Sequence, residues 1–236
     1  MANVISPDYI LINGISSNTV GLYIDTPPVP PMAHQRYQQY QVGADTDIVS
    51  PDDSFENIKI TVNAFQFFPE NFDNRAIYEF LKDAQTLQTS RFHNFLYRIQ
   101  KLTVQNPESS NNGKKIRYRI DFECEPFKYA VENPMEDISQ GTVQNSGNRY
   151  SRPIWTVTGN GGGDCRLTVN GSEFWIFNNL NETACIDTQK MIVYTESEII
   201  TQKTSGKLPF LSAGENSVSW NENVSGVTLQ KNERWY

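Results

Sequence analysis

Residues 207–236 read KLPFLSAGENSVSWNENVSGVTLQKNERWY, and this stretch decides the class of fold that we expect. Gly214 lies in a predicted tight turn, and in Ser217–Trp220 two serines alternate with apolar side chains. Such alternation predicts a strand with one polar and one apolar face. A second strand is predicted over Val227–Gln230, and the short polar loop between them predicts a hairpin. By this pattern alone, the chain closes on a β-sandwich.

The residues before this stretch follow the same pattern of short strands and turns. Turn signals recur roughly every 8–12 residues, a spacing typical of a sandwich. Asn170-Gly171, between two apolar runs, is a strong hairpin signal. The glycine-rich Gly159–Asp164 could cradle a phosphate only ahead of a helix, and because a strand is predicted after it we expect a plain turn.

The first half carries a single predicted helix among strands. The helix is expected at about residues 71–86, with an apolar stripe formed by Ile77, Phe80, Leu81, Ala84 and Leu87. Strands over Asn94–Val104 and Lys114–Glu125 flank a polar tip, which predicts a long hairpin arm at about residues 95–125. An acidic loop is expected over Gly43–Ser54. A polar, proline-containing stretch near Pro126–Gln140 then separates two domains, 1–133 and 134–236.

Composition excludes several classes of function. The chain has 236 residues and a net charge of −7, whereas a protein that binds duplex nucleic acid usually shows a basic excess. It has no apolar run long enough to cross a membrane. Cys124, Cys165 and Cys185 are too widely spaced for a metal site or a disulfide framework. We therefore expect three reduced thiols, in a protein that is made in a cytoplasm.

No constellation of side chains predicts catalysis. His34 and His93 are the only histidines, and neither has a cysteine nearby in the sequence. Asp121, Glu123 and Glu125 share one face of one predicted strand, whereas paired catalytic carboxylates face each other across a cleft. We therefore expect no catalytic, cofactor-binding or metal-binding residue and no enzymatic activity.

A basic strip on the predicted hairpin is the main candidate for a contact surface. It consists of Lys114, Lys115, Arg117 and Arg119. One interpretation is a solvated face. The other is that the hairpin reaches a neighbouring copy and pairs with its acidic residues Asp45, Asp47, Asp52 and Asp53, because complementary charges fix the register of an interface.

The order of signals along the chain also carries a resemblance. They are Gly141-Thr142, Pro153-Ile154 with Gly159, Val169–Gly171, Ile186–Thr188, and Lys207–Leu211 before Gly214–Asn216 and Trp220. This ordered set resembles the distal tail proteins (Dit) of long-tailed siphophages and prophages, over essentially the whole chain. The resemblance implies a mainly β fold: a ring-forming, β-sandwich-like N-terminal domain with one helix and a hairpin arm, then a C-terminal galectin-like β-sandwich.

The same resemblance implies a structural role in the virion. The protein would form a homohexameric ring at the distal end of the tail, as a baseplate hub. It would join the tail tube protein to tail-associated or receptor-binding proteins, and DNA would pass through its channel without specific binding.

Two alternatives come from other classes of function. A galectin-like module could recognise a host cell-wall glycan by stacking sugar on an exposed tryptophan, for which Trp155 and Trp175 are the candidates. A wall-degrading enzyme is disfavoured by the missing acid–base pair.

Overall fold

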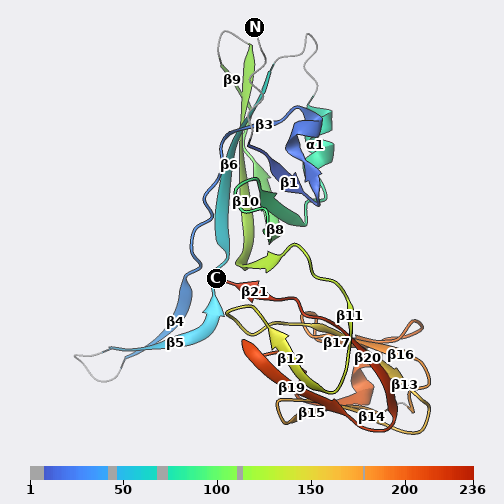
Figure 1. Ribbon diagram of the computed structural model, residues 1–236. Coiled ribbons are helices and arrows are strands. Elements are labelled where there is room, and N and C mark those ends of the chain that lie inside the picture. Colours follow the sequence, from blue (N-terminus) through green and yellow to red (C-terminus); the bar gives the residue numbers. More distant parts are fainter. Residues whose placement is uncertain (1–7, 42–46, 68–73, 111–113, 178) are drawn as a thin grey trace. The chain divides into compact units, whose positions relative to one another are not determined.

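The computed structural model describes residues 8–41, 47–67, 74–110, 114–177 and 179–236. The chain divides into two compact units, Met1–Val131 together with Tyr236, and Glu132–Trp235. Strands make up most of the regular structure of both units, so the mainly β class predicted from the sequence is confirmed (Figure 1).

The first unit is built on one antiparallel sheet. Its order is β2-β1-β7-β8-β10-β6-β3, and β9 also pairs with β10. The elements of this unit are β1 (Ile10–Ile12), β2 (Ile15–Ser16), the 3-10 helix η1 (Ser17–Val20), β3 (Tyr23–Thr26), β4 (Gln35–Gln41), β5 (Asp47–Phe55), β6 (Ile58–Phe67), α1 (Arg75–Leu81), β7 (Thr86–Thr89), β8 (Phe95–Val104), β9 (Glu108–Ser110) and β10 (Lys115–Ala130).

Strand β10 is the central strand of this sheet. Its 16 residues pair with β6 on one side and with β8 and β9 on the other. Alternate side chains therefore point to opposite faces. Ile116, Tyr118, Ile120 and Phe122 are buried in the core of the unit, as the sequence pattern predicts. The expected hairpin of residues 95–125 exists as β8 and β10, but because β6 covers the other edge of β10, this hairpin is an internal part of the sheet.

The helix is shorter than expected. α1 covers Arg75–Leu81, and residues 71–73 lie outside the described part of the chain. The predicted end at residue 86 is wrong, because Thr86 begins strand β7. Ile77 and Leu81 of the expected stripe are buried from the helix, whereas Leu87 is buried from β7. Leu87 falls on the core side whether the segment is a helix or a strand. The apolar pattern therefore could not show where the helix ends and the strand begins.

Pro126 lies inside β10 and not in a linker. The ladder between β10 and β8 shifts register between Cys124 and Lys128, at the position where Pro126 would otherwise have to donate a hydrogen bond. Proline is tolerated within a strand at such irregularities, since it has no N–H. The polar stretch that was expected to begin at Pro126 therefore begins later, after β10.

A second, separate sheet of the first unit contains β4 and β5. The prediction of a loop over Gly43–Ser54 is wrong from Asp47 onwards, because Asp47–Phe55 pairs with Gln35–Gln41. Aspartate is uncommon in strands, so the aspartates of this segment led to the prediction of a loop. The base of this ribbon is fixed by a hydrogen bond from Glu56 N to His34 O (2.9 Å) and by the rings of Phe55 and Phe127, whose centroids are 5.3 Å apart.

The second unit is a sandwich of two five-stranded sheets, ordered β11-β20-β13-β16-β17 and β12-β19-β14-β15-β18. Its elements are β11 (Glu136–Ile138), β12 (Gly141–Asn145), β13 (Ile154–Gly159), β14 (Cys165–Val169), β15 (Ser172–Ile176), β16 (Thr183–Asp187), β17 (Ile192–Tyr194), the 3-10 helix η2 (Thr201–Lys203), β18 (Thr204–Gly206), β19 (Gly214–Trp220), β20 (Val224–Gln230) and β21 (Arg234–Trp235). One buried cluster draws side chains from both sheets, including Trp155, Val157 and Leu229 from one and Leu167 and Phe174 from the other.

The two C-terminal strands exist, but they do not form the predicted hairpin with each other. β19 pairs with β12 and β14, whereas β20 pairs with β11 and β13 in the opposite sheet. Asn221 between them donates to the carbonyl of Asp164 (2.9 Å) and accepts from the backbone of Arg166 (3.0 Å), which holds the crossing chain. A short loop can connect two strands of one sheet or two strands of different sheets. The length of the loop between β19 and β20 therefore did not show which strands pair.

The hairpin predicted at Asn170-Gly171 is confirmed. β14 pairs with β15 across it, and Asn170 and Gly171 both have positive φ angles, 50° and 75°. Two positive φ angles are the requirement of the tight turn that matches the twist of paired strands.

We expect replacement of Trp155 to destabilise the second unit strongly. The side chain is fully buried, and its indole N–H donates to the carbonyl of Pro209 (2.7 Å). Trp155→Ala should cost about 3–5 kcal/mol through the cavity. Trp155→Phe should cost about 1–3 kcal/mol, largely because the Pro209 carbonyl loses its donor. Hydrogen exchange of the β13 and β16 amides measures the free energy of opening, and the half-buried Trp175 (Trp175→Phe) is the control. Equal effects of Trp155→Phe and Trp175→Phe would contradict the assignment.

Candidate functional site

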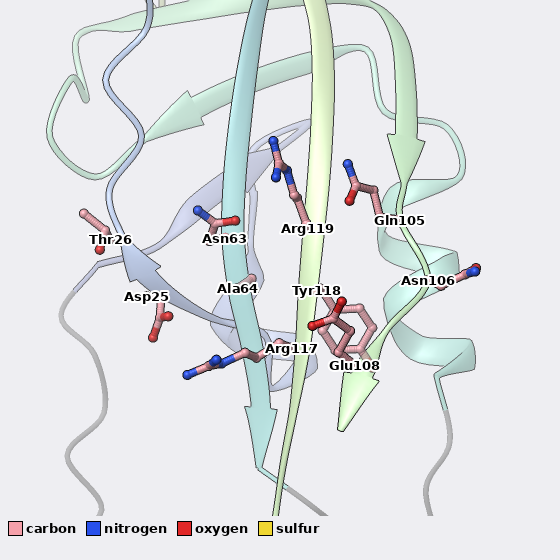
Figure 2. Close-up of a pocket in the computed structure, with 10 residues that line it drawn as sticks. All are labelled: Asp25, Thr26, Asn63, Ala64, Gln105, Asn106, Glu108, Arg117, Tyr118 and Arg119. Carbon is pink, nitrogen blue, oxygen red and sulfur yellow. The ribbon is translucent and has the colours of Figure 1, made fainter. Parts of the chain in front are cut away.

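A polar concavity of the first unit lies on the outer face of its sheet and has a volume of about 380 Å³. Strands β3, β6 and β10 and the chain around β9 contribute to it (Figure 2). It is lined by Asp25, Thr26, Asn63, Ala64, Gln105, Asn106, Glu108, Arg117, Tyr118 and Arg119. Two members of the predicted basic strip, Arg117 and Arg119, are therefore side chains of this site.

Arg117 and Arg119 are exposed because they occupy the outward positions of β10. Arg119 is opposite Asn63 of β6, and Arg117 is opposite Glu108 of β9 in the strand register. Arg117 forms no ion pair within 4.0 Å with any residue that the structure describes. Its guanidinium is thus available for a contact outside the chain.

Asp121 organises the polar face beside these arginines. Its carboxylate accepts hydrogen bonds from Thr61 Oγ1 (2.7 Å) and Gln105 Nε2 (3.2 Å) and forms an ion pair with Lys59 Nζ (2.9 Å). The Nε of Arg119 is 3.9 Å away. The bonds from Lys59 and Thr61 lower the pKa of Asp121. Because other donors already satisfy Asp121, most of the bonding capacity of Arg119 remains unused.

The other two members of the basic strip behave differently. Lys114 is exposed. Lys115 lies with its Nζ 3.5 Å from the centroid of the Phe65 ring and 3.3 Å from Asp25 Oδ1, so it is engaged inside the unit. Lys115 therefore supports the sheet, whereas Lys114 and the two arginines are exposed.

The acidic residues that the sequence suggests as partners belong to strand β5 or precede it in the sequence. Asp45 lies outside the described residues, and of β5, which carries Asp47, Asp52 and Asp53, only the backbone is described for these positions. Asp47, Asp52 and Asp53 belong to β5 of the β4–β5 ribbon and not to the sheet that carries the arginines. Their pairing with Arg117 and Arg119 stays a prediction.

Sequence reasoning missed three polar side chains that complete the concavity, Asn63, Gln105 and Glu108. Each comes from a different segment, and only the register of β10 with β6 and β9 places them together. A signal for Asn63 was present, since it occupies an outward position of a strongly alternating strand.

The residues weighed for catalysis are engaged in structural contacts. Glu123 accepts from Asn57 Nδ2 (3.1 Å), and Glu125 accepts from Gln100 Nε2 (2.9 Å). Both histidines are exposed. Burial raises the pKa of the Cys124 thiol to about 12, which keeps it protonated and unreactive at neutral pH. Within the described ranges, no group of three or more His, Cys, Asp or Glu side chains is placed to hold a metal ion.

The glycine-rich loop after β13 forms a turn that is held by side-chain hydrogen bonds. The side chain of Asn160 accepts from Gly162 N (2.8 Å) and donates to the carbonyl of Glu222 (2.8 Å). Strand β14 follows the loop, so the loop lacks the helix N-terminus that phosphate binding of this kind requires.

The two tryptophans proposed to stack on sugar lie in opposite environments. Trp155 is fully buried, so it cannot contact a ligand, and its assignment is wrong. Trp175 points to the outer face of its sheet, because its neighbours Phe174 and Ile176 fill the core positions of β15. No helix in the described part of the chain is long and apolar enough to span a membrane.

The Asp121 network predicts a dependence of stability on pH. Because the folded-state pKa is lowered, the network stabilises the fold above the ordinary aspartate pKa of about 3.9, and this contribution is lost as the pH falls through the lower folded value. Asp121→Asn should cost about 1–2 kcal/mol at pH 7 and much less at about pH 2. Urea unfolding at both pH values measures this, with the exposed Asp137→Asn as control. An equal loss at both pH values would contradict the role of the carboxylate.

Comparisons with known proteins identify the fold. No family model matches the sequence, and no curated protein matches it. Among solved structures, the chain is similar to the crystal structure of the SPP1 Dit (gp 19.1) protein, described as a paradigm of the hub adsorption apparatus in phages that infect Gram-positive bacteria. The TM-score is 0.65 at 13% identity, over 94% of this chain and 96% of the other. The chain therefore has the fold of a Dit protein, which confirms the resemblance seen in the sequence.

Proposed function

We propose that this chain is a structural protein of a phage tail, located at its distal end, that assembles into a homohexameric ring. The ring joins the tail tube to tail-associated or receptor-binding proteins and leaves a channel for DNA. The observation that carries this proposal is the match to SPP1 Dit, a hub protein, over almost the whole length of both chains.

The β4–β5 ribbon supports assembly with further copies. It is a two-stranded sheet separate from the main sheet, and an isolated two-stranded ribbon is at best marginally stable in water. Tyr37 on β4 is 61% exposed. Exposed strand edges and aromatic side chains favour pairing with another chain. In the ring, this ribbon contacts the neighbouring copy. It takes the role of the arm that the sequence predicted for residues 95–125.

The concavity around Arg117 and Arg119 supplies the complementary surface. Because the site also contains Glu108 and Asp25, its charges are mixed and suit a protein surface better than a nucleic-acid backbone. The aspartates of the neighbouring ribbon, Asp47, Asp52 and Asp53, are the partners that we assign to the two arginines. A contact between two different patches of the same chain closes a ring when repeated by rotation.

We assign to the second unit the role of a docking platform for other tail proteins. Its sandwich has a complete core of its own, so partners can bind it without changing its fold. We infer a galectin-like arrangement for this unit from the resemblance, and a role in holding tail-tip proteins and not in chemistry.

Charge reversal of the two arginines should weaken the ring without unfolding the subunit. The wild-type chain is expected at about six times its mass of 26.9 kDa. Arg117→Glu combined with Arg119→Glu should shift the population to smaller species, by at least about tenfold in the assembly constant, because like charges then face each other. Light scattering over a range of concentrations measures the mass, and circular dichroism checks the fold.

The matched control is Arg91→Glu with Lys207→Glu, which changes the net charge equally at two other exposed positions. If this control assembles like the wild type while the arginine variant does not, the concavity is the interface. A wild-type chain that stays monomeric at high concentration would overturn the ring, and equal masses for both variants would remove the arginines from it.

A further inference from the structure

An aromatic pair lies on the outer face of the second unit. Trp175 and Phe177 are two positions apart on and just after β15, and their ring planes are 3° from parallel with centroids 6.1 Å apart. Phe177 is 47% exposed, and Trp175 is partly exposed. Phe174 and Ile176 fill the core positions, so this pair adds nothing to the core, and exposed aromatic side chains of this kind are typical of contact surfaces.

A charged pair holds the tryptophan in place. Arg166 lies opposite Trp175 in the register of β14 and β15, and its guanidinium carbon is 5.3 Å from the centroid of the indole ring. Arg166 Nη1 is 2.9 Å from Glu173 Oε1, and the indole N–H of Trp175 donates to Glu173 Oε2 (3.1 Å). Three side chains on two paired strands thus fix one another, which lowers the entropy cost of binding.

The same cluster has an unsatisfied donor. Arg166 Nε is buried but has no hydrogen-bond partner among the described residues. A ligand oxygen would reach the outer N–H groups of the guanidinium instead, since the Arg166 side chain is 37% exposed. The carboxylate of Glu173 already balances the charge of Arg166, so a second anion has little to gain here.

The rest of this face is rich in hydroxyl groups. Thr168 lies between Glu173 and Ser219 in the strand register, and Ser205 lies beside Trp175. A stable protein interface buries about 800 Å² on each partner around an apolar centre. A narrow aromatic pair surrounded by serine and threonine side chains fits a small polar ligand better than a protein.

We propose that the surface formed by Arg166, Glu173, Trp175 and Phe177 binds a neutral oligosaccharide. A pyranose ring has an apolar C–H face that packs on an aromatic side chain, and hydroxyl groups around its edge that both donate and accept. The hydroxyls accept from Arg166 and donate to Glu173, while the ring covers Trp175 or Phe177. This inference does not depend on the proposed ring, because each can hold without the other.

The test is a titration of the full chain with four neutral oligosaccharides, lactose, cellotetraose, maltotetraose and chitotetraose, and with the acidic tetramer of galacturonate. The ¹H–¹⁵N signal of the Trp175 indole, assigned with Trp175→Phe, reports binding. We expect at least one neutral probe to shift this signal with a Kd of about 1 mM. Trp175→Ala should weaken that binding by at least about tenfold, and Arg166→Lys should weaken it too, because a lysine lacks the planar fork of donors.

Two controls separate binding from folding. The indole signal of Trp155 should be unchanged in Trp175→Ala, which shows that the core is intact. Tyr78→Ala removes a 52% exposed aromatic ring from the other unit and should leave binding unchanged.

Three results would overturn the proposal. The first is no shift of the Trp175 signal with any neutral probe up to about 20 mM, which is far above the expected Kd. The second is equal binding of the galacturonate tetramer, which would mean that charge and not sugar shape is recognised. The third is a loss of assembled mass in Trp175→Ala, which would assign this surface to contacts between copies.

Discussion

The double pairing of β10 is the constraint on which the first unit depends. Backbone hydrogen bonds to β6 on one side and to β8 and β9 on the other fix the register of three segments at once. Since side chains alternate strictly along a strand, a slip by one residue would move Ile120 and Phe122 to solvent and Arg119 and Asp121 into the core. The ladder therefore decides both where the apolar core forms and which polar side chains gather on the outer face.

Three groups of the first unit with shifted pKa values, Asp121, Tyr97 and Cys124, have structural surroundings. Asp121 is held ionised by Lys59 and Thr61, which lie on the adjacent strand β6. Burial raises the pKa of Tyr97 and of Cys124 to about 12, and both lie in the core of the unit. Catalytic sites shift pKa values towards the working pH of a general acid or base, whereas these shifts move away from neutrality. The same side chains that would be sought as catalysts are used to hold strands together.

The sequence predicted those features that depend on neighbouring residues. The alternation of β10, the turn at Asn170-Gly171 and the position of the helix follow from local geometry, and all three are present. Features that depend on distant partners could not be predicted. β19 and β20 have the composition of a hairpin, and only packing across the core places them in opposite sheets. Asp47–Phe55 forms a strand because β4 pairs with it, although its aspartates favour a loop. The concavity around Arg117 likewise required the register of three strands.

The β4–β5 ribbon differs from the rest of the chain because the described side chains of β4 do not belong to a buried core. The helix-covered sheet and the sandwich each enclose a cluster of buried apolar side chains. The described side chains of β4 contribute to neither cluster, and Tyr37 is largely exposed. Its backbone hydrogen bonds to β5 offset only part of the entropy lost on ordering, because hydrogen bonds to water compete with them. The conformation of this ribbon must then be stabilised by something outside its own strands. In the ring that we propose, the next copy of the chain is the partner that we assign to this ribbon.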